Sequence, residues 1–390
     1  MFNLLSVVWN PELELFRLFG LPVRYYSLMW CIGLVAAYFL VRKFFKDRKI
    51  SDDTFEPLFV YCFLGILIGA RVGHCIFYQP DYYLTSFEHF IEMLLPIAFT
   101  PDGVKMVGYA GLRPTIEAIK AKKTIALANK ETLVVAGEII CRLAQRHKVN
   151  ILPVDSEHSA IFQSLVGEKS DSIEKLLLTA SGGPFRTFSY EQMQHVTAAQ
   201  ALQHPNWEMG AKITIDSASM MNKGFEVIEA RWLFDIPVDK IQVLVHPQSV
   251  VHSAVQFVDG SVKAQLGTPD MRIPIQYALT YPQRWLSDVP RLDFFANNQL
   301  TFEEPDLQRF PNLALAYEAM NQGGNMPCIL NAANEVVNQL FREGKCGFLQ
   351  MSDIISQTMQ KATFITQPTY EDYVQTDNEA RKIAMKLLKL

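Results

Sequence analysis

The 390-residue chain lacks the features of disulfide-rich, zinc-binding and nucleic-acid-binding proteins. Its six cysteines form no CxxC pair and no closely spaced framework, so we expect buried thiols rather than disulfides or zinc ligands. The formal net charge is -4, which indicates no general affinity for nucleic acid. No small-residue cleavage site follows the first apolar run, so no cleavable signal peptide is expected.

A glycine-rich turn between a strand and a helix is also missing from residues 1–112. Such a turn cradles the pyrophosphate of a dinucleotide in doubly wound folds. The glycines at 65, 69 and 73 lie inside an apolar run instead. This part of the chain is therefore not expected to hold NAD or NADP.

Two long apolar runs occur in the first hundred residues. Residues 25–41 carry no charge, and residues 58–78 are interrupted by Arg71 and His74. Each run is close to the roughly 20 residues that cross a bilayer. Both are apolar all round rather than on one face. The pattern predicts two transmembrane helices; the alternative is a pair of buried helices in a soluble core.

The loop between the two runs is basic, with five lysines and arginines between residues 42 and 49. Cytoplasmic loops of membrane proteins carry such an excess. The loop is thus expected inside and the chain after residue 78 outside. Arg71 is a candidate for a functional site within the membrane, or for an arginine that reaches the interface.

From about residue 106 the pattern changes to alternating helix and strand. Residues 116–120 and 130–146 have helical periodicity, whereas 124–127 and 149–154 are short apolar runs. The second apolar run ends at Asp155 and Glu157. Two carboxylates at i and i+2 on an extended strand end point the same way and suit one divalent cation. The alternative for this tripeptide is an ordinary loop.

Three further segments favour the same chemistry. Residues 179–184 place hydroxyls beside two glycines, whose amides can approach an anion closely. Residues 216–226 supply hydroxyls, an amide, the Lys223 ammonium and a carboxylate, a set that suits a phosphorylated polyol and a metal. Trp207 lies in a Pro- and Gly-bounded stretch, 204–210, that is plausible as a lid. Each segment also fits a turn, a cap or a packed tryptophan. Together they predict a metal-dependent sugar-phosphate enzyme.

The motifs of this second part closely resemble the 1-deoxy-D-xylulose 5-phosphate reductoisomerase family, from about residue 106 to residue 390. They are Ala-Asn-Lys-Glu at 128–131, Val-Asp-Ser-Glu-His at 154–158, Ser-Gly-Gly-Pro-Phe at 181–185, Asn-Lys-Gly-Phe-Glu at 222–226, His-Pro-Gln-Ser-Val-Val-His-Ser at 246–253 and Leu-Gly-Thr-Pro-Asp-Met at 266–271. The resemblance implies an NADPH-dependent oxidoreductase and isomerase of non-mevalonate isoprenoid biosynthesis. The implied reaction yields 2-C-methyl-D-erythritol 4-phosphate and uses Mg²⁺, Mn²⁺ or Co²⁺. A cytoplasmic homodimer is expected for the family.

The resemblance also implies roles for individual residues at matching positions. The implied metal ligands are Asp155, Glu157 and Glu226. The implied catalytic residues are Lys130, Glu157 and His204. The implied substrate contacts are Lys130, Ser156, Glu157, Ser181, His204, Trp207, Ser217, Asn222, Lys223 and Glu226. The implied cofactor contacts are Asn129, Glu131 and Gly210. His158 is expected to be structural, and His246 and His252 to be buried and hydrogen-bonded.

The first part of the chain, to about residue 112, resembles prolipoprotein diacylglyceryl transferase, a membrane enzyme with several spans. The resemblance rests on Tyr-Tyr-Ser-Leu-Met at 25–29, Gly-Ala-Arg-Val-Gly at 69–73 and Phe-Tyr at 77–78. That family continues with a His-Gly-Gly motif, whereas this chain continues with Arg-Pro-Thr at 113–115. Transferase activity is therefore not expected. Residues 108–112 fit both families, which suggests a gene fusion or a sequence-assembly chimera.

The expected architecture has three parts. Residues 1–105 are a membrane segment with spans at about 25–41 and 58–78. Residues 106–300 form an α+β catalytic domain, and residues 301–390 form a C-terminal helical domain. The Rossmann NADPH domain of the family is largely absent, so the chain alone is expected to be inactive and membrane-associated. The alternatives are a diacylglyceryl transferase fragment and a non-catalytic, membrane-tethered binder of metal and sugar phosphate.

Overall fold

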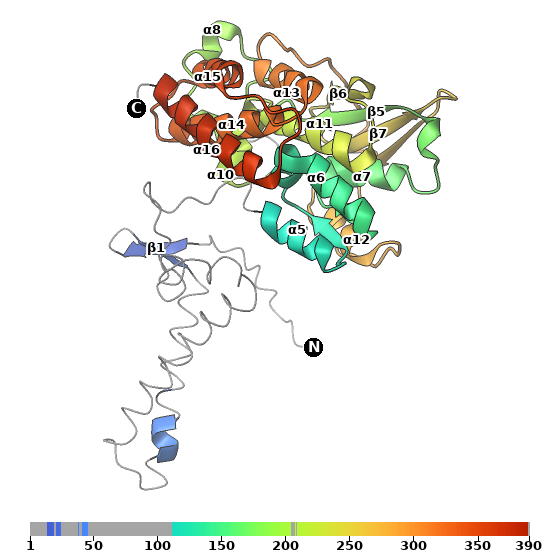
Figure 1. Cartoon of the computed structure of the whole chain (residues 1–390). Helices are drawn as coiled ribbons and strands as arrows, with labels where there is room; N and C mark the ends of the chain where they lie inside the picture. The colour runs from blue at the N-terminus through green and yellow to red at the C-terminus, as the bar shows by residue number, and fades with distance from the viewer. Residues whose placement is uncertain are drawn as a thin grey trace. The chain divides into compact units, whose positions relative to one another are not determined.

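The computed structural model describes residues 14–18, 21–24, 38, 41–45, 111–203, 207 and 209–388 (Figure 1). The chain divides into two compact units, Met1–Lys105 and Met106–Leu390. In the first unit, β1 (Glu14–Leu18) pairs antiparallel with β2 (Leu21–Arg24). Apart from residues 38 and 41, the two expected spans lie outside the described residues. Among the residues described, no helix combines the length and the apolar character that a bilayer crossing requires.

The second unit contains a four-stranded mixed sheet in the order β6-β5-β7-β8. Central β5 pairs parallel with β6 and antiparallel with β7, and β7 pairs antiparallel with β8. The strands are β5 (Ile173–Ala180), β6 (Ile241–Val245), β7 (Val251–Phe257) and β8 (Val262–Leu266). Together with the helices described next, this sheet confirms the predicted α+β class for this part of the chain.

A smaller layer precedes the sheet and follows the predicted alternation. Its elements are α5 (Leu112–Lys120), β3 (Ile125–Leu127), α6 (Glu131–His147) and β4 (Ile151–Pro153). Strands β3 and β4 are parallel, so the chain leaves both at the same edge. Residues 128–131 and 154–157, which carry most of the acidic and basic candidates, follow these two strands directly.

The predicted geometry of the Asp155 segment is wrong. The strand ends at Pro153, and helix α7 (Ser156–Ser164) begins one residue after Asp155. Asp155 is the N-cap of α7, with φ −58° and ψ 138°, and Glu157 lies in the first helical turn. The two carboxylates therefore do not alternate along an extended strand. The direction of each is set by the turn from β4 into α7.

Four helices lie between β5 and β6, and a fifth follows β8. They are α8 (Tyr190–Met193), α9 (Ala198–Ala201), α10 (Ala211–Ala218), α11 (Met221–Phe234) and α12 (Arg272–Thr280). Met220, with φ 62°, joins α10 directly to α11. This sharp junction brings the end of α10 and the first turn of α11 together.

The C-terminal region is helical, as predicted, and its helices gather on one side of the second unit (Figure 1). Its helices are α13 (Pro311–Gln322), α14 (Met326–Arg342), α15 (Phe348–Lys361) and α16 (Tyr370–Leu387). The sequence pattern predicts helix at residues 316–320, 329–341 and 351–359, and these stretches lie in α13, α14 and α15. Helix α16 was not predicted because its buried face includes Thr376 and Asp377 beside small alanines, which weakens the apolar periodicity.

The main apolar core lies between the sheet and the helices that follow it. Leu176 and Leu178 of β5 pack in one buried cluster with Phe225 of α11, Leu313 of α13 and Ile329 of α14. A second cluster under α5 and α6 includes Ile119 and Cys328. Cys328 and Cys346 are buried free thiols, as expected from the cysteine spacing. Because α11 packs against both clusters, the polar side chains on its first turns are rigidly held.

Candidate active site

Ten of the candidate site residues line one cavity of about 240 Å³ in the second unit. The cavity lies where the loops after β3, β4 and β5 meet the junction of α10 and α11. These ten residues are Lys130, Asp155, Ser156, Glu157, Ser181, Trp207, Ser217, Asn222, Lys223 and Glu226. Segments up to 96 residues apart in the sequence thus meet, as the contact of Lys130 with Glu226 shows.

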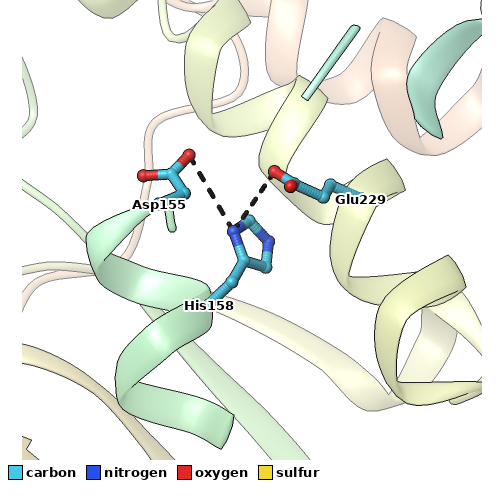
Figure 2. Close-up of side chains that lie close together, drawn as sticks. All are labelled: Asp155, His158 and Glu229. Carbon is cyan, nitrogen blue, oxygen red and sulfur yellow. Dashed lines mark ion pairs between the residues drawn. The ribbon is translucent and has the colours of Figure 1, made fainter. Parts of the chain in front are cut away.

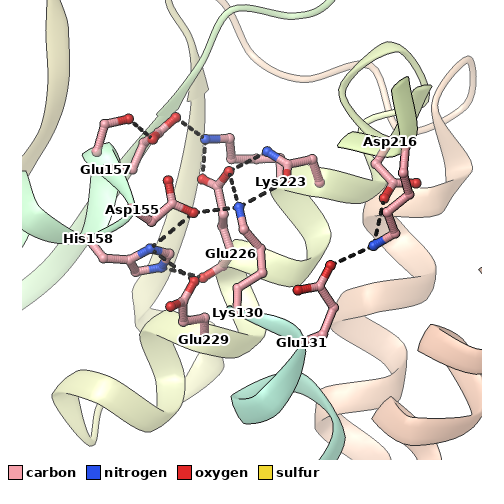
Figure 3. A network of polar contacts seen from close by, with 12 residues as sticks. Lys130, Glu131, Asp155, Glu157, His158, Asp216, Lys223, Glu226 and Glu229 are labelled. Carbon is pink, nitrogen blue, oxygen red and sulfur yellow. Dashed lines mark hydrogen bonds and ion pairs between the residues drawn. The ribbon is translucent and has the colours of Figure 1, made fainter. Parts of the chain in front are cut away.

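Three carboxylates converge in this cavity (Figure 3). Asp155 and Glu157 come from the start of α7, and Glu226 comes from α11. One oxygen of each lies within 4.8 Å of the others. Hard divalent cations prefer such a set of carboxylate oxygens. The arrangement can hold a metal ion without a change in the backbone.

Two buried lysines neutralise the carboxylates. The Lys130 ammonium forms ion pairs with Asp155 and Glu226 and donates to Asn222 Oδ1 at 2.9 Å. The Lys223 ammonium lies 2.7 Å from Glu157 Oε1 and also pairs with Glu226. Buried ions are stable only when they are paired in this way. Three carboxylates and two ammonium groups leave the cluster with one uncompensated negative charge.

The pKa values of the cluster reflect this packing. Burial and the nearby carboxylates of Glu157 and Asp155 raise the pKa of Glu226 to about 7, although the two lysine ammonium groups act to lower it. Burial also acts to raise the pKa of Asp155, but Lys130 and His158 hold it well below its usual value. For Lys223, the carboxylates outweigh burial and raise the pKa of the ammonium. Both lysines are therefore cations at neutral pH, ready to bind an anionic ligand.

Hydroxyl, amide and ammonium side chains also line the cavity. Ser181 follows β5, Ser217 lies near the end of α10, and Asn222 and Lys223 lie in the first turn of α11. Gly183 has φ +69°, and a Cβ placed on it would lie 2.8 Å from the Ser217 carbonyl oxygen. Glycine at this position therefore lets the loop after β5 approach α10 closely.

Gly183→Ala is expected to destabilise the protein by about 1–3 kcal/mol, through its backbone conformation and the clash with Ser217. Gly260→Ala is the matched control, because Gly260 also has positive φ, +85°, but nothing lies within 4 Å of the added Cβ. Urea unfolding should show a larger loss for the first variant. Equal losses would contradict a close approach at Gly183.

The proposed cofactor residues lie outside the cavity lining. Asn129 Oδ1 accepts hydrogen bonds from the backbone and hydroxyl of Thr132, at the start of α6. Glu131 forms an ion pair with Lys212, and Gly210 is the N-cap of α10. His204, a predicted catalytic residue, lies outside the described residues.

Lys212 connects three helices near the site. Its ammonium lies 2.6 Å from Glu131 on α6, 3.2 Å from Asp216 on α10 and 3.0 Å from Glu335 on α14. Asp216 also accepts from Asn338 on α14 at 2.8 Å. The C-terminal helices therefore anchor the segment that carries Ser217.

Two histidines expected to be buried and hydrogen-bonded also line the cavity. His246 bonds to the carbonyl of Thr301 at 2.9 Å and accepts from the amide of Val250 at 3.2 Å, so that prediction is confirmed for it. His252 is buried on β7, and its ring lies 6.3 Å from that of Trp207. The sequence-based prediction missed Ser249, Met209 and Met271, which line the same cavity. The His-Pro-Gln-Ser motif was the available signal for Ser249.

Family models match most of the chain. Residues 104–137 match 1-deoxy-D-xylulose 5-phosphate reductoisomerase, residues 151–234 match its C-terminal domain, and residues 266–383 match a further DXP reductoisomerase C-terminal domain. Residues 14–99 match prolipoprotein diacylglyceryl transferase. Both resemblances seen in the sequence are thereby confirmed.

Curated relatives and solved structures agree over the second part. The 1-deoxy-D-xylulose 5-phosphate reductoisomerase of Bacteroides thetaiotaomicron is 68% identical over 283 residues, covering 73% of each chain. The Porphyromonas gingivalis reductoisomerase is 59% identical over 283 residues, which again cover 73% of each chain. The Zymomonas mobilis enzyme in complex with NADPH matches with a TM-score of 0.69 and 46% identity, over 73% of each chain. Another reductoisomerase, solved with NADPH, fosmidomycin and magnesium, matches with a TM-score of 0.68 and 44% identity, over 73% of this chain and 74% of that one. The chain therefore belongs to the 1-deoxy-D-xylulose 5-phosphate reductoisomerase family, whose members are NADPH-dependent isomeroreductases.

Proposed function

We propose that residues 106–390 bind 1-deoxy-D-xylulose 5-phosphate and a divalent metal ion, as the catalytic part (106–300) and the C-terminal helical part (301–390) of a reductoisomerase. The observation that carries this proposal is the meeting of three carboxylates, two lysines and several hydroxyls in one cavity. A metal and a phosphorylated sugar require those groups together.

Asp155, Glu157 and Glu226 are the proposed ligands of Mg²⁺, Mn²⁺ or Co²⁺. The residues present fit such an ion: the donors are all carboxylate oxygens, and the buried Asp155 Oδ2 already faces a cation, the Lys130 ammonium. The two ammonium groups now balance the carboxylates that would face the cation. A bound metal supplies Lewis-acid polarisation of the carbonyl and hydroxyl oxygens of the substrate.

The substrate is proposed to lie with its phosphate against Ser181, Ser217, Asn222 and Lys223, which supply neutral donors and one point charge. Lys130, Ser156, Glu157 and Glu226 would contact its polyol end. Lys130 and Glu157 are proposed to orient the hydroxyls and to hold a proton there. Trp207 is proposed to cover the ligand, with His204 beside it.

The cofactor side is proposed to be incomplete. Asn129, Glu131 and Gly210 are the proposed contacts of this chain to NADPH. Residues 1–112 contain no glycine-rich turn, and residues 14–99 match a different family. Hydride transfer requires a cofactor held close to the substrate carbon. We therefore propose that this chain alone does not turn over, because the Rossmann NADPH domain is largely absent.

The first part is proposed to tether the chain to a membrane through spans at residues 25–41 and 58–78. Its match to prolipoprotein diacylglyceryl transferase favours this proposal. Transferase activity is not proposed, since the chain departs from that family after residue 112. The second candidate function is accordingly a non-catalytic, membrane-tethered binder of metal and sugar phosphate.

Binding of 1-deoxy-D-xylulose 5-phosphate to the purified full-length chain, by calorimetry with saturating Mn²⁺, tests the proposed site. Lys223→Met is expected to weaken binding about ten- to hundredfold, because a charged hydrogen bond to phosphate is lost. Lys345→Met is the control, since Lys345 pairs with Glu343 at the surface. Binding that is absent, or that is indifferent to Lys223→Met, would rule out the assignment.

A further inference from the structure

His158 lies directly behind the carboxylate cluster, and no role in the proposed chemistry uses it. Its ring is fully buried, between Asp155 and Glu229 (Figure 2). Nδ1 lies 3.3 Å from Glu229 Oε2 and 3.9 Å from Asp155 Oδ2. Neither Nδ1 nor Oε2 makes a hydrogen bond to any other group in the described residues.

The position of the hydrogens follows from the other ring nitrogen. Nε2 lies 2.8 Å from the backbone carbonyl of Glu226, which can only accept, so Nε2 carries a hydrogen and donates it. Nδ1 then faces two carboxylates. The nearer one is Glu229, whose Oε2 lies 3.3 Å from Nδ1. The ring therefore contacts the Glu229 side chain through one nitrogen and the Glu226 backbone through the other.

This ring connects two of the proposed metal ligands. Nδ1 faces the Asp155 side chain at the start of α7, and Nε2 holds the backbone of Glu226 on α11. A shift of the ring therefore displaces one ligand by its side chain and the other by its main chain. Phe234 stacks on the ring at 6.3 Å and limits its movement on that side.

Glu229 fixes the ring from α11. It is 1% exposed, lies one helical turn after Glu226, and forms no ion pair with a lysine or arginine in the described part of the chain. A carboxylate is costly to bury with a single partner. Its one close polar partner here is His158.

We propose that Glu229 and His158 are positioning residues for the metal site. Glu229 acts through His158 to hold the Asp155 carboxylate and the Glu226 backbone in the positions that the metal requires. This inference rests on the proposed metal site. A purely structural tie between α7 and α11 would stabilise the fold without affecting metal affinity, so the two roles are separable.

Mn²⁺ titration of the full-length chain by calorimetry tests the proposal with Glu229→Leu, His158→Phe and the double variant. Each single variant is expected to weaken Mn²⁺ binding roughly tenfold or more, the usual effect of losing a partner behind a ligand. Because Glu229 acts through His158, the double variant should bind no more weakly than His158→Phe. Glu229→Gln should recover part of the affinity, since its amide can donate to Nδ1.

Asp377→Leu is the matched control, because Asp377 is also 1% exposed but pairs with Arg381 on α16, outside this cluster. Its Mn²⁺ affinity should equal that of the parent. Glu229→Leu should lower affinity while its thermal midpoint stays within a few degrees of that of the parent. Parent-like Mn²⁺ affinity in Glu229→Leu, or additive losses in the double variant, would overturn the proposal.

Metal-free crystal structures of the parent and of Glu229→Leu test the positioning role independently of metal binding. In Glu229→Leu the His158 ring and the Asp155 carboxylate should be displaced relative to the parent. An unmoved Asp155 would contradict the positioning role. Failure of the parent to bind Mn²⁺ would instead count against the proposed function, and the two structures would still decide whether Glu229 positions Asp155.

Discussion

Replacement of residues 1–105 by the dinucleotide-binding domain of the Bacteroides thetaiotaomicron relative is expected to raise NADPH-dependent turnover at least about 1000-fold. Holding two reactants in place contributes roughly 7–11 kcal/mol, and recovery of about 4 kcal/mol is sufficient for that increase. The two chains are 68% identical over 283 residues, so the grafted domain would meet a closely similar surface. NADPH oxidation with 1-deoxy-D-xylulose 5-phosphate and Mn²⁺ measures the effect.

Asp155→Asn in the same graft provides the control, because it should return turnover to the level of the parent. A correctly folded graft that is no faster than the parent would show that the second part of the chain is itself damaged. The explanation would then lie within residues 106–390 rather than in the replaced cofactor domain.

Asp155→Asn in the unmodified chain is expected to weaken Mn²⁺ binding about 100-fold or more. The amide keeps the size of the side chain but removes one of three charged ligands, and ligand charge largely sets the affinity of such sites. Calorimetry on the full-length chain measures the change.

Asp235→Asn is the matched control for that measurement. Asp235 follows α11, and its exposed side chain pairs with Arg231. The same change of charge there should leave Mn²⁺ affinity unaltered. Equal Mn²⁺ affinities for Asp155→Asn and the parent would remove Asp155 from the proposed ligand set.

The identity of the cavity residues was predictable from sequence, but their geometry was not. Asp155 and Glu157 were expected to point the same way along a strand, whereas the chain turns into α7 between them. They approach Glu226 because α7 begins where β4 ends and α11 packs alongside. A local pattern carries no information about that packing.

Contacts between distant segments were the hardest to predict. Lys212 bonds to Glu131, Asp216 and Glu335, which span more than 200 positions of the sequence. His158 was expected to be structural, and its place between Asp155 and Glu229 depends on the meeting of α7 and α11. Helix α16 was not predicted for a local reason: polar side chains on its buried face obscure the apolar periodicity of the helix.

The first hundred residues illustrate the opposite case. Their apolar runs and motifs indicate a second family without any tertiary information, and the match over residues 14–99 agrees. What the sequence could not supply is a structure for those runs, which lie almost entirely outside the described residues. Their role as spans stays a prediction.

We propose that this chain has kept a metal and sugar-phosphate site while its cofactor domain has been replaced. NADPH oxidation by the purified full-length chain, with 1-deoxy-D-xylulose 5-phosphate and Mn²⁺, is the decisive measurement. We expect no oxidation above the substrate-free blank, although the same preparation binds the sugar phosphate. Turnover at the rate of the Bacteroides thetaiotaomicron relative would contradict it.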